Sequence, residues 1–316
     1  MKIVVTGGLG HIGSKLIRKL PFNFSNIEIV IVDNLLTQRY YSLFNLPDRG
    51  KYSFIKADIT KDNLEKIFDD VFIVIHLAAI TDATSSFENR KIVEKNNFIC
   101  TKKIANICLI KKIPMLTLST TSVYGDQERI VDENCSIENL KPQSPYAETK
   151  LKEENYLKKL NIEYGLMYTS LRFGTIFGVS PGMRFHTAVN KFCLQAVMGI
   201  PLTIWKTAFN QKRPYLELDD AINSIIFFMK KNIFEGETFN VVTCNASVNE
   251  IVTILKKNVK KLEIEFVESQ VMNQLSYSVS NSKIKAKGFK FTGKLEMGIL
   301  ETIKTLKNLN FNNKLL

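Results

Sequence analysis

The chain has 316 residues, 45% of them hydrophobic, which fits an ordinary soluble globular protein with one large domain or two modest ones. No apolar stretch approaches the roughly 20 residues of a membrane span, and the N-terminus has no signal-peptide pattern, so we expect a cytoplasmic protein without membrane contact. The net charge of +12 comes largely from dispersed lysines, a pattern that argues against nucleic-acid binding and leaves a basic surface able to attract an anionic substrate such as a nucleotide.

Strand-like and helix-like segments alternate through the first half of the chain. Apolar segments predict strands at 2–6, 27–32, 53–57, 71–77, 114–119 and 165–172. Helices are expected between them, notably at 11–20, 61–69, 91–110 and 145–160. Strands that are apolar on both faces and separated by helices indicate a parallel sheet covered on two sides. The expected fold class is therefore α/β, with a Rossmann-like doubly wound parallel sheet.

The alternation becomes irregular after residue 172. Helices are expected at 183–199, 219–231, 247–258 and 295–307, with short strands between them. We therefore expect a Rossmann domain at 1–172 and a smaller C-terminal α/β substrate lobe at 173–316, with about 214–242 returning to the first domain.

A glycine-rich turn joins the first strand to the first helix. Gly7, Gly10 and Gly13 in VVTGGLGHIGS (4–14) permit a tight turn and the close approach of the backbone to a pyrophosphate at the helix N-terminus. The second strand ends near Asp33, whose carboxylate would accept hydrogen bonds from a ribose 2′-OH and repel a 2′-phosphate, so NAD is favoured over NADP. Asp58, at the end of the third strand, is either an acceptor for an adenine amino group or a capping residue.

The stretch SPYAETK (144–150) places Tyr146 and Lys150 four residues apart. Tyr52 and Lys56 have the same spacing in a segment that we expect to be a strand. On a helix, residues four apart lie on one face, one turn from each other, whereas on a strand two further pleats separate them. Only the first pair is therefore expected to act together.

Together these stretches resemble the extended short-chain dehydrogenases/reductases, in the NAD-dependent nucleotide-sugar epimerase/dehydratase branch, and most of all the UDP-galactose/UDP-glucose 4-epimerases. The matching stretches occur in family order: TGGLGHIG (6–13), VDN (32–34), ADIT (57–60), HLAA (76–79), NN (96–97), LSTTSVYGDQ (118–127), PQSPYAETK (142–150), SLRFGTIFG (170–178) and QKRPYLELDDA (211–221). The resemblance implies that the first domain binds NAD and that the lobe binds a nucleotide sugar.

By this resemblance, Tyr146 exchanges a proton with a sugar hydroxyl while hydride moves to or from the nicotinamide. A free phenol has a pKa near about 10 and is a poor base at neutral pH, so a neighbouring ammonium and an oxidised nicotinamide would both help by lowering that pKa. Lys150 would supply the ammonium and hold the nicotinamide ribose. Thr120, at the end of the fifth strand, would hydrogen-bond the sugar hydroxyl.

The resemblance also implies the remaining site residues. The cofactor contacts are Gly7, Gly10, His11, Ile12, Gly13, Asp33, Asn34, Asp58, Ile59, Leu77, Ala78, Ala79, Asn97, Tyr146 and Lys150. The substrate contacts are Thr81, Ser122, Thr175, Asn190, Arg213 and Tyr277. Arg213 would grip the diphosphate, because a guanidinium donates two parallel hydrogen bonds to phosphate oxygens. Arg184 and His186 lie in the same segment as Asn190, where a surface or core histidine is the simpler interpretation of His186.

Two departures from the family narrow the reaction. Thr121 and Ser122 stand where 4,6-dehydratases usually carry an Asp–Glu pair, and neither is a strong acid or base, so a dehydratase is disfavoured. Thr175 stands where UDP-galactose 4-epimerases have an Asn that helps to hold the phosphates, which leaves the nucleotide sugar open. We expect an NAD-dependent epimerase acting at C4 of a UDP-hexose. The alternatives are an NAD(P)H-dependent nucleotide-sugar reductase, a decarboxylase and a non-catalytic dinucleotide-sensing module.

The sequence also allows predictions about disulfides, metal sites and self-association. The five cysteines and three histidines are scattered, so neither a disulfide framework nor a metal site is expected. The family often dimerises through two helices per subunit, and the resemblance therefore implies a homodimer through 91–110 and 145–160.

Overall fold

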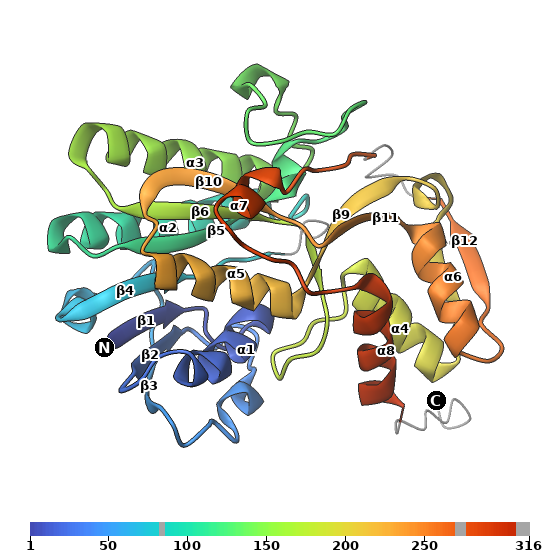
Figure 1. Cartoon of the computed structure of the whole chain (residues 1–316), viewed down its shortest axis with the longest axis horizontal. Coiled ribbons are helices and arrows are strands. Elements are labelled where there is room, and N and C mark those ends of the chain that lie inside the picture. The colour runs from blue at the N-terminus through green and yellow to red at the C-terminus, as the bar shows by residue number, and fades with distance from the viewer. Residues whose placement is uncertain (82–85, 269–275, 308–316) are drawn as a thin grey trace.

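Seven parallel strands form the central sheet of the computed structural model, which describes residues 1–81, 86–268 and 276–307 (Figure 1). Their order is β10-β6-β5-β4-β1-β2-β3. The strands are β1 (Lys2–Thr6), β2 (Glu28–Asp33), β3 (Lys51–Lys56), β4 (Val71–His76), β5 (Met115–Thr120), β6 (Tyr168–Phe173) and β10 (Glu235–Val241). The chain order reverses between β1 and β4, so the predicted doubly wound α/β fold is confirmed.

Helices cover both faces of this sheet. One face carries α1 (His11–Lys19) and α5 (Leu218–Lys231), and the other carries α2 (Arg90–Lys111) and α3 (Pro145–Tyr164). Side chains along a strand alternate between faces. In β1, Ile3 and Val5 belong to the apolar core shared with α1 and α5, whereas Val4 belongs to the core shared with α2 and α3. This two-sided burial explains why the central strands are apolar almost without interruption.

The predicted helix at 61–69 is wrong, because this segment forms only a short 3₁₀ turn, Glu65–Phe68. The side chain of Asn63 accepts a hydrogen bond from Glu65 N at 3.0 Å, a local turn that competes with helix formation. Asp70 then takes a left-handed conformation with φ 56° directly before β4. The other 3₁₀ turns are Leu20–Phe22, Tyr40–Leu43, Thr121–Val123, Ile137–Asn139 and Lys206–Ala208.

A smaller lobe follows the sixth strand. It holds a three-stranded sheet, β11-β9-β7, and a two-stranded sheet, β12-β8. Its strands are β7 (Thr175–Phe177), β8 (Leu202–Trp205), β9 (Lys212–Glu217), β11 (Cys244–Ser247) and β12 (Ile264–Val267). Its helices are α4 (Ala188–Met198), α6 (Val248–Asn258) and α8 (Leu295–Leu306), and the short α7 (Ser282–Ala286) packs on β10. A separate apolar core, which includes Phe177, Tyr215 and Ile251, holds the lobe together.

Two boundaries bear on the predicted organisation. The helix expected at 183–199 begins only at Ala188, so the residues before it form a loop. Both α5 and β10 lie within the segment 214–242, and β10 pairs with β6 at one edge of the central sheet. The domain limits at 172 and 173 remain predictions.

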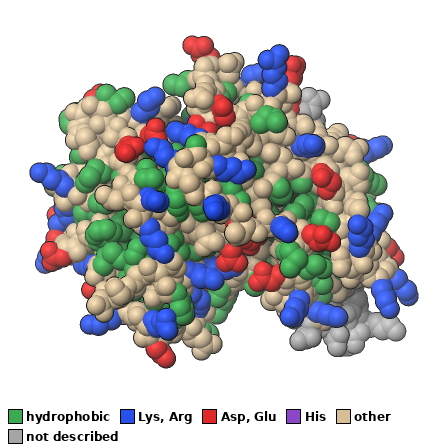
Figure 2. All heavy atoms as spheres, viewed as in Figure 1, with side chains coloured by type: hydrophobic (Ala, Val, Ile, Leu, Met, Phe, Trp, Pro, Cys, Tyr) green, Lys and Arg blue, Asp and Glu red, His purple; other side chains and the backbone are tan. Residues whose placement is uncertain are grey.

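The surface agrees with the dispersed charge of the sequence. Figure 2 shows Lys and Arg side chains spread over the visible face instead of gathered into one block. Among the described residues, no helix combines the length and the apolar character needed to cross a bilayer.

Candidate active site

A cavity of about 650 Å³ opens at the carboxyl ends of the central strands and extends toward the lobe. Its walls include Thr120 at the end of β5, Phe173 at the end of β6 and Tyr215 of β9. Doubly wound sheets bind ligands where their strand order reverses, and this cavity lies there.

The glycine loop forms the floor of one half of the cavity. Gly7 has φ +67°, and a Cβ atom built on it would lie 2.6 Å from the backbone nitrogen of Ala78. A Cβ on Gly13 would lie 2.6 Å from the Cα of Gly8. Both positions therefore require glycine. Helix α1 begins after Gly10 without a side-chain cap, which leaves its first amides suited to an anion such as a pyrophosphate.

Two acidic side chains border the same half of the cavity. Asp33 accepts hydrogen bonds from Leu35 N at 2.9 Å and from Leu9 N at 3.2 Å, so the glycine loop itself holds its carboxylate at the rim. The backbone and hydroxyl of Thr60 both donate to Asp58, at 2.9 and 2.6 Å, and these bonds lower the pKa of Asp58. Asp58 therefore caps a turn and also lines the cavity.

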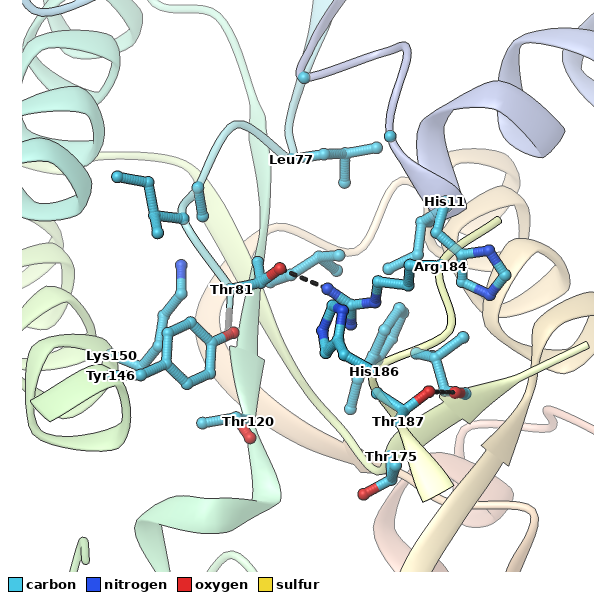
Figure 3. Close-up of a pocket in the computed structure, with 18 of the residues that line it drawn as sticks. His11, Leu77, Thr81, Thr120, Tyr146, Lys150, Thr175, Arg184, His186 and Thr187 are labelled. Carbon is cyan, nitrogen blue, oxygen red and sulfur yellow. Dashed lines mark hydrogen bonds between the residues drawn. The ribbon is translucent and has the colours of Figure 1, made fainter. Parts of the chain in front are cut away.

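Three side chains predicted to be catalytic meet at the centre of the cavity. Tyr146 lies in the first turn of α3, which Ser144 caps by accepting a hydrogen bond from Ala147 N at 3.2 Å. Figure 3 shows the Tyr146 hydroxyl pointing into the pocket, with Lys150 beside the ring and Thr120 nearby at the end of its strand. This geometry suits proton transfer between Tyr146 and a bound hydroxyl.

The ammonium of Lys150 is buried. Burial by itself lowers the pKa of Lys150, but the Glu153 carboxylate, 2.9 Å away, and then the Tyr146 phenol act in the opposite direction. The net result is a pKa above the ordinary value of lysine. Lys150 therefore carries a positive charge at neutral pH, as stabilisation of a phenolate requires.

Toward the lobe, the cavity is lined by a mixture of apolar, polar and basic side chains. The residues expected from the resemblance to contact the substrate that line the cavity are Thr81, Ser122, Thr175, Arg213 and Tyr277. Atom Nη2 of Arg213 is buried and has no hydrogen-bond partner among the described residues. Such a donor is suited to a phosphate oxygen, because a buried N–H group without an acceptor is otherwise unfavourable.

Further lining residues went unassigned from the sequence. Arg184 donates to the hydroxyl of Thr81, as the dashed line in Figure 3 marks. Others with polar, charged or aromatic side chains include Arg39, His186, Thr187, Lys191, Thr203 and Trp205. The segment around Arg184 and His186 did stand out in the sequence, but its expected helical conformation concealed the loop that brings these side chains to the cavity.

Two residues that were predicted to contact the cofactor or the substrate do not line the cavity. Asn97 accepts from Ile80 N at 2.8 Å and donates to Ile80 O at 2.9 Å, so its amide fixes the segment after β4. Asn190 accepts from Gly178 N and donates to Arg184 O, each at 3.1 Å, so it holds the loop before α4. In this geometry both residues support the site indirectly, while the remaining predicted site residues all border the cavity.

Comparisons with known proteins show which family the chain belongs to. The model of the NAD dependent epimerase/dehydratase family matches residues 3–241. An uncharacterized UDP-glucose epimerase of Bacillus subtilis, YtcB, is 31% identical over 265 residues, which are 81% of each chain. The structure of UDP-glucuronic acid 4-epimerase from Bacillus cereus, in complex with UDP-glucuronic acid and NAD, is 28% identical, with a TM-score of 0.85 over 97% of this chain and 99% of that one.

A UDP-glucose 4-epimerase from Thermotoga maritima, with UDP-glucose, is 25% identical, also with a TM-score of 0.85 over 97% of this chain and 99% of that one. The family match and these structures confirm the predicted resemblance and the predicted cofactor, NAD. The chain therefore belongs to the NAD-dependent epimerase/dehydratase family.

Proposed function

We propose that this protein is an NAD-dependent epimerase that inverts C4 of a UDP-sugar. The observation that carries the proposal is the meeting of Thr120, Tyr146 and a charged, buried Lys150 in a cavity with a glycine loop at one end and Arg213 at the other. The relatives add support, because several are named as UDP-sugar 4-epimerases.

The side chains of this cavity account for the proton movements of such a reaction. Bound NAD supplies the hydride acceptor in the first half-reaction and the hydride donor in the second. As hydride leaves C4, Tyr146 takes the proton of the C4 hydroxyl, and Thr120 hydrogen-bonds the same oxygen. Lys150 stabilises the phenolate form of Tyr146. After the keto sugar has rotated, hydride returns to the opposite face of C4, and Tyr146 gives the proton back to the C4 oxygen.

Arg213 would hold the diphosphate during this turn. A sugar can present first one face and then the other to the same nicotinamide only if its nucleotide stays bound while the hexose rotates. The unpartnered Nη2 of Arg213 is a suitable anchor for that nucleotide.

A dehydratase remains disfavoured. The hydroxyl of Thr121 donates to the backbone oxygen of Phe173 at 3.4 Å, and Thr121 is buried. It therefore offers neither an acidic group nor an open one for the elimination of water. An NAD(P)H-dependent reductase and a decarboxylase are the alternative reactions, and no described residue of the cavity favours either one.

The deciding experiment begins with the protein purified without added cofactor. We expect denaturation to release NAD in near-equal amount, and we expect the untreated protein to interconvert C4 epimers of UDP-glucose, UDP-N-acetylglucosamine or UDP-glucuronic acid, followed by NMR. The three sugars differ in their exocyclic group or in the substituent at C2, so they test which of these the cavity accepts. Stoichiometric consumption of added NADH with a keto sugar, and no epimerisation, would instead identify a reductase.

We also infer that the protein is a cytoplasmic homodimer. The support for a dimer is the outer surface of α2 and α3, where Ile92, Ile110 and Ile162 expose 60%, 80% and 72% of their surface and would be covered by a partner copy. Light scattering of the purified protein tests this inference, and Ile110→Lys should convert a dimer into a monomer.

A further inference from the structure

Glu153 lies three residues after Lys150 on α3 and is almost completely buried with it. The exposed fractions of the two side chains are 5% for Lys150 and 4% for Glu153, and Nζ lies 2.9 Å from Oε2. A glutamate is rarely buried to this degree unless it is paired. The removal of two charges from water is unfavourable, and an apolar pair of similar size would often be at least as stable. Stability alone is thus a weak reason for this ion pair.

A chain of hydrogen bonds leads to the same carboxylate from other elements. Thr101 of α2 donates to Glu153 Oε2 at 2.8 Å, and its oxygen lies 3.3 Å from His76 Nε2. The other ring nitrogen, Nδ1, lies 2.7 Å from the hydroxyl of Thr6. Because the one hydroxyl proton of Thr101 goes to Glu153, His76 must donate from Nε2 and accept at Nδ1 from Thr6. All these donors are directed toward Glu153, as expected if it is ionised.

Two other titratable neighbours among the described residues, His76 and Cys100, carry no charge to compensate Lys150. Burial, with a smaller effect of Lys150, lowers the pKa of His76 to about 3, so this ring is neutral. Burial raises the pKa of Cys100 of α2 to about 12, so its thiol is neutral as well. Tyr146 faces Lys150 from the same helix. Among these groups Glu153 is the one that supplies a fixed negative charge.

The second oxygen of the carboxylate, Oε1, is buried and has no hydrogen-bond partner among the described residues. An unsatisfied buried oxygen is unfavourable and needs an explanation beyond packing. The explanation that fits is electrostatic, since a carboxylate in this place weakens the field of Lys150 and fixes its position.

We propose that Glu153 is a positioning residue of the proposed epimerase: its buried carboxylate fixes the ammonium of Lys150 beside Tyr146 and determines how strongly that charge acts on the phenol. This inference rests on the proposed role of Tyr146 as the acid and base. The carboxylate touches neither the sugar nor the cofactor in this scheme.

The sign of the effect follows from the charges. In Glu153→Gln, Lys150 loses its counter-charge, so a positive charge that is less compensated favours the Tyr146 phenolate and lowers the pKa of the phenol. Burial without a carboxylate also makes the ammonium less favourable, so the pKa of Lys150 falls as well. Both limbs of the pH–rate profile should therefore move toward acid, by about one pH unit.

The chain supplies a matched control in the next residue. Glu154 is buried on the same helix and forms a two-point ion pair with Arg172, with N–O distances of 2.9 and 2.6 Å. Glu154→Gln removes an equally buried charge from a different cation. It should lower the melting temperature and leave both the pKa of Tyr146 and the pH–rate profile where they are.

The experiment measures the pKa of Tyr146 without turnover. Protein labelled with ¹³C at the tyrosine Cζ is titrated by NMR, and Tyr146→Phe assigns the resonance. The pH dependence of kcat is measured in parallel on the UDP-sugar that reacts. We expect an acid shift of both readouts in Glu153→Gln and no shift in Glu154→Gln. An unchanged pKa in Glu153→Gln, or equal shifts in both variants, would overturn the proposal.

Glu153→Asp covers the case in which Glu153→Gln does not fold. It keeps the charge and shortens the side chain, so the pKa of Tyr146 should stay near the wild-type value while kcat falls. An unchanged kcat in Glu153→Asp would contradict the positioning role. Absence of epimerisation in the wild-type protein would overturn the proposed function alone, because the NMR titration still reports whether Glu153 acts on Tyr146.

Discussion

Strand β3 and helix α3 each carry a tyrosine followed four residues later by a lysine, and the two pairs have different surroundings. Tyr146 and Lys150 line the cavity together. On β3, at the edge of the sheet, the Tyr52 hydroxyl donates to the backbone oxygen of Ile17 at 3.4 Å, while Lys56 is exposed. The same spacing thus brings the two side chains together only on the helix, where residues four apart lie one turn from each other. On a strand they share a face but lie about 13 Å apart.

The electrostatic surroundings of the two phenols differ as well. Burial raises the pKa of Tyr52, and the nearby Arg18 opposes this only in part. Tyr146 instead has the buried ammonium of Lys150 next to it on its own helix. A phenol becomes a useful base beside such a charge and not by burial, which moves its pKa away from neutral pH.

The largest test of this contrast is the removal of each hydroxyl. Tyr146→Phe should lower kcat by about 10²–10⁴-fold, because it removes the group that takes and returns the proton. The bound NAD, measured after denaturation, should be unchanged. Tyr52→Phe is the control and should retain full turnover. An equal loss of turnover in both variants would show that the hydroxyl on α3 has no special role in the reaction.

Replacement of each lysine should separate the pairs further. Lys150→Met leaves Glu153 buried without its partner, a change that typically costs about 3–5 kcal/mol of unfolding free energy, and turnover should fall with it. Lys56→Met changes an exposed side chain and should alter stability by less than about 0.5 kcal/mol. Denaturant titration measures both effects. A stable Lys150→Met protein would show that the buried pair is not coupled to the fold.

These contrasts also show how far the sequence could be interpreted. The glycine loop, Asp33 and the helical Tyr146–Lys150 pair are local patterns, so their placement follows from a few neighbouring residues. The stretch LKEEN (151–155) does not predict that Glu153 is buried, because a glutamate near lysines on a helix usually lies in solvent. Its burial depends on the packing of α2 against α3, which the local pattern does not contain.

Contacts between distant segments were hidden for the same reason. The hydroxyl oxygen of Ser180 lies 2.9 Å from Nδ1 of His11, and Gly182 N donates to the hydroxyl of Ser14 at 2.8 Å. A Cβ on Gly182 would lie 2.4 Å from the backbone oxygen of Gly10. The loop before α4 therefore packs directly on the glycine loop. Residues about 170 apart in the chain meet there, and no periodic pattern in the sequence predicts such a contact.

The two regions should also respond to opposite ends of the pH scale. His76, behind Lys150, has a pKa of about 3 in the folded protein against an ordinary value of 6.5. The unfolded chain therefore binds a proton first on acidification, and stability should fall below pH 6.5 by up to about 1.4 kcal/mol per pH unit. The pKa of Tyr52 is raised in the folded protein, so the unfolded chain loses the phenol proton first as the pH rises. The stability that Tyr52 contributes should therefore be lost only above its ordinary pKa of 10.0.

Urea titration across this range measures the slopes. His11, whose pKa burial also lowers well below its ordinary value, adds to the acid slope. His76→Gln should therefore flatten the slope between pH 6.5 and about 4 without abolishing it. An unchanged pH dependence of stability in His76→Gln would show that groups other than His76 cause the acid sensitivity.

The smallest expected effect concerns the turn that presents Tyr146. The side chain of Ser144 caps α3 by accepting a hydrogen bond from Ala147 N, and Ser144→Ala should lower the free energy of unfolding by about 1 kcal/mol. Because Tyr146 lies in that first turn, fraying should displace its hydroxyl and lower kcat a few-fold, with the pKa of Tyr146 nearly constant. Ser53→Ala, at an exposed position of β3, is the control and should change neither stability nor turnover. If Ser144→Ala lowered stability but left kcat intact, the position of the phenol would depend on the packing of α3 against the sheet and not on its cap. The contrast between strand and helix would then rest on tertiary packing as much as on helical periodicity.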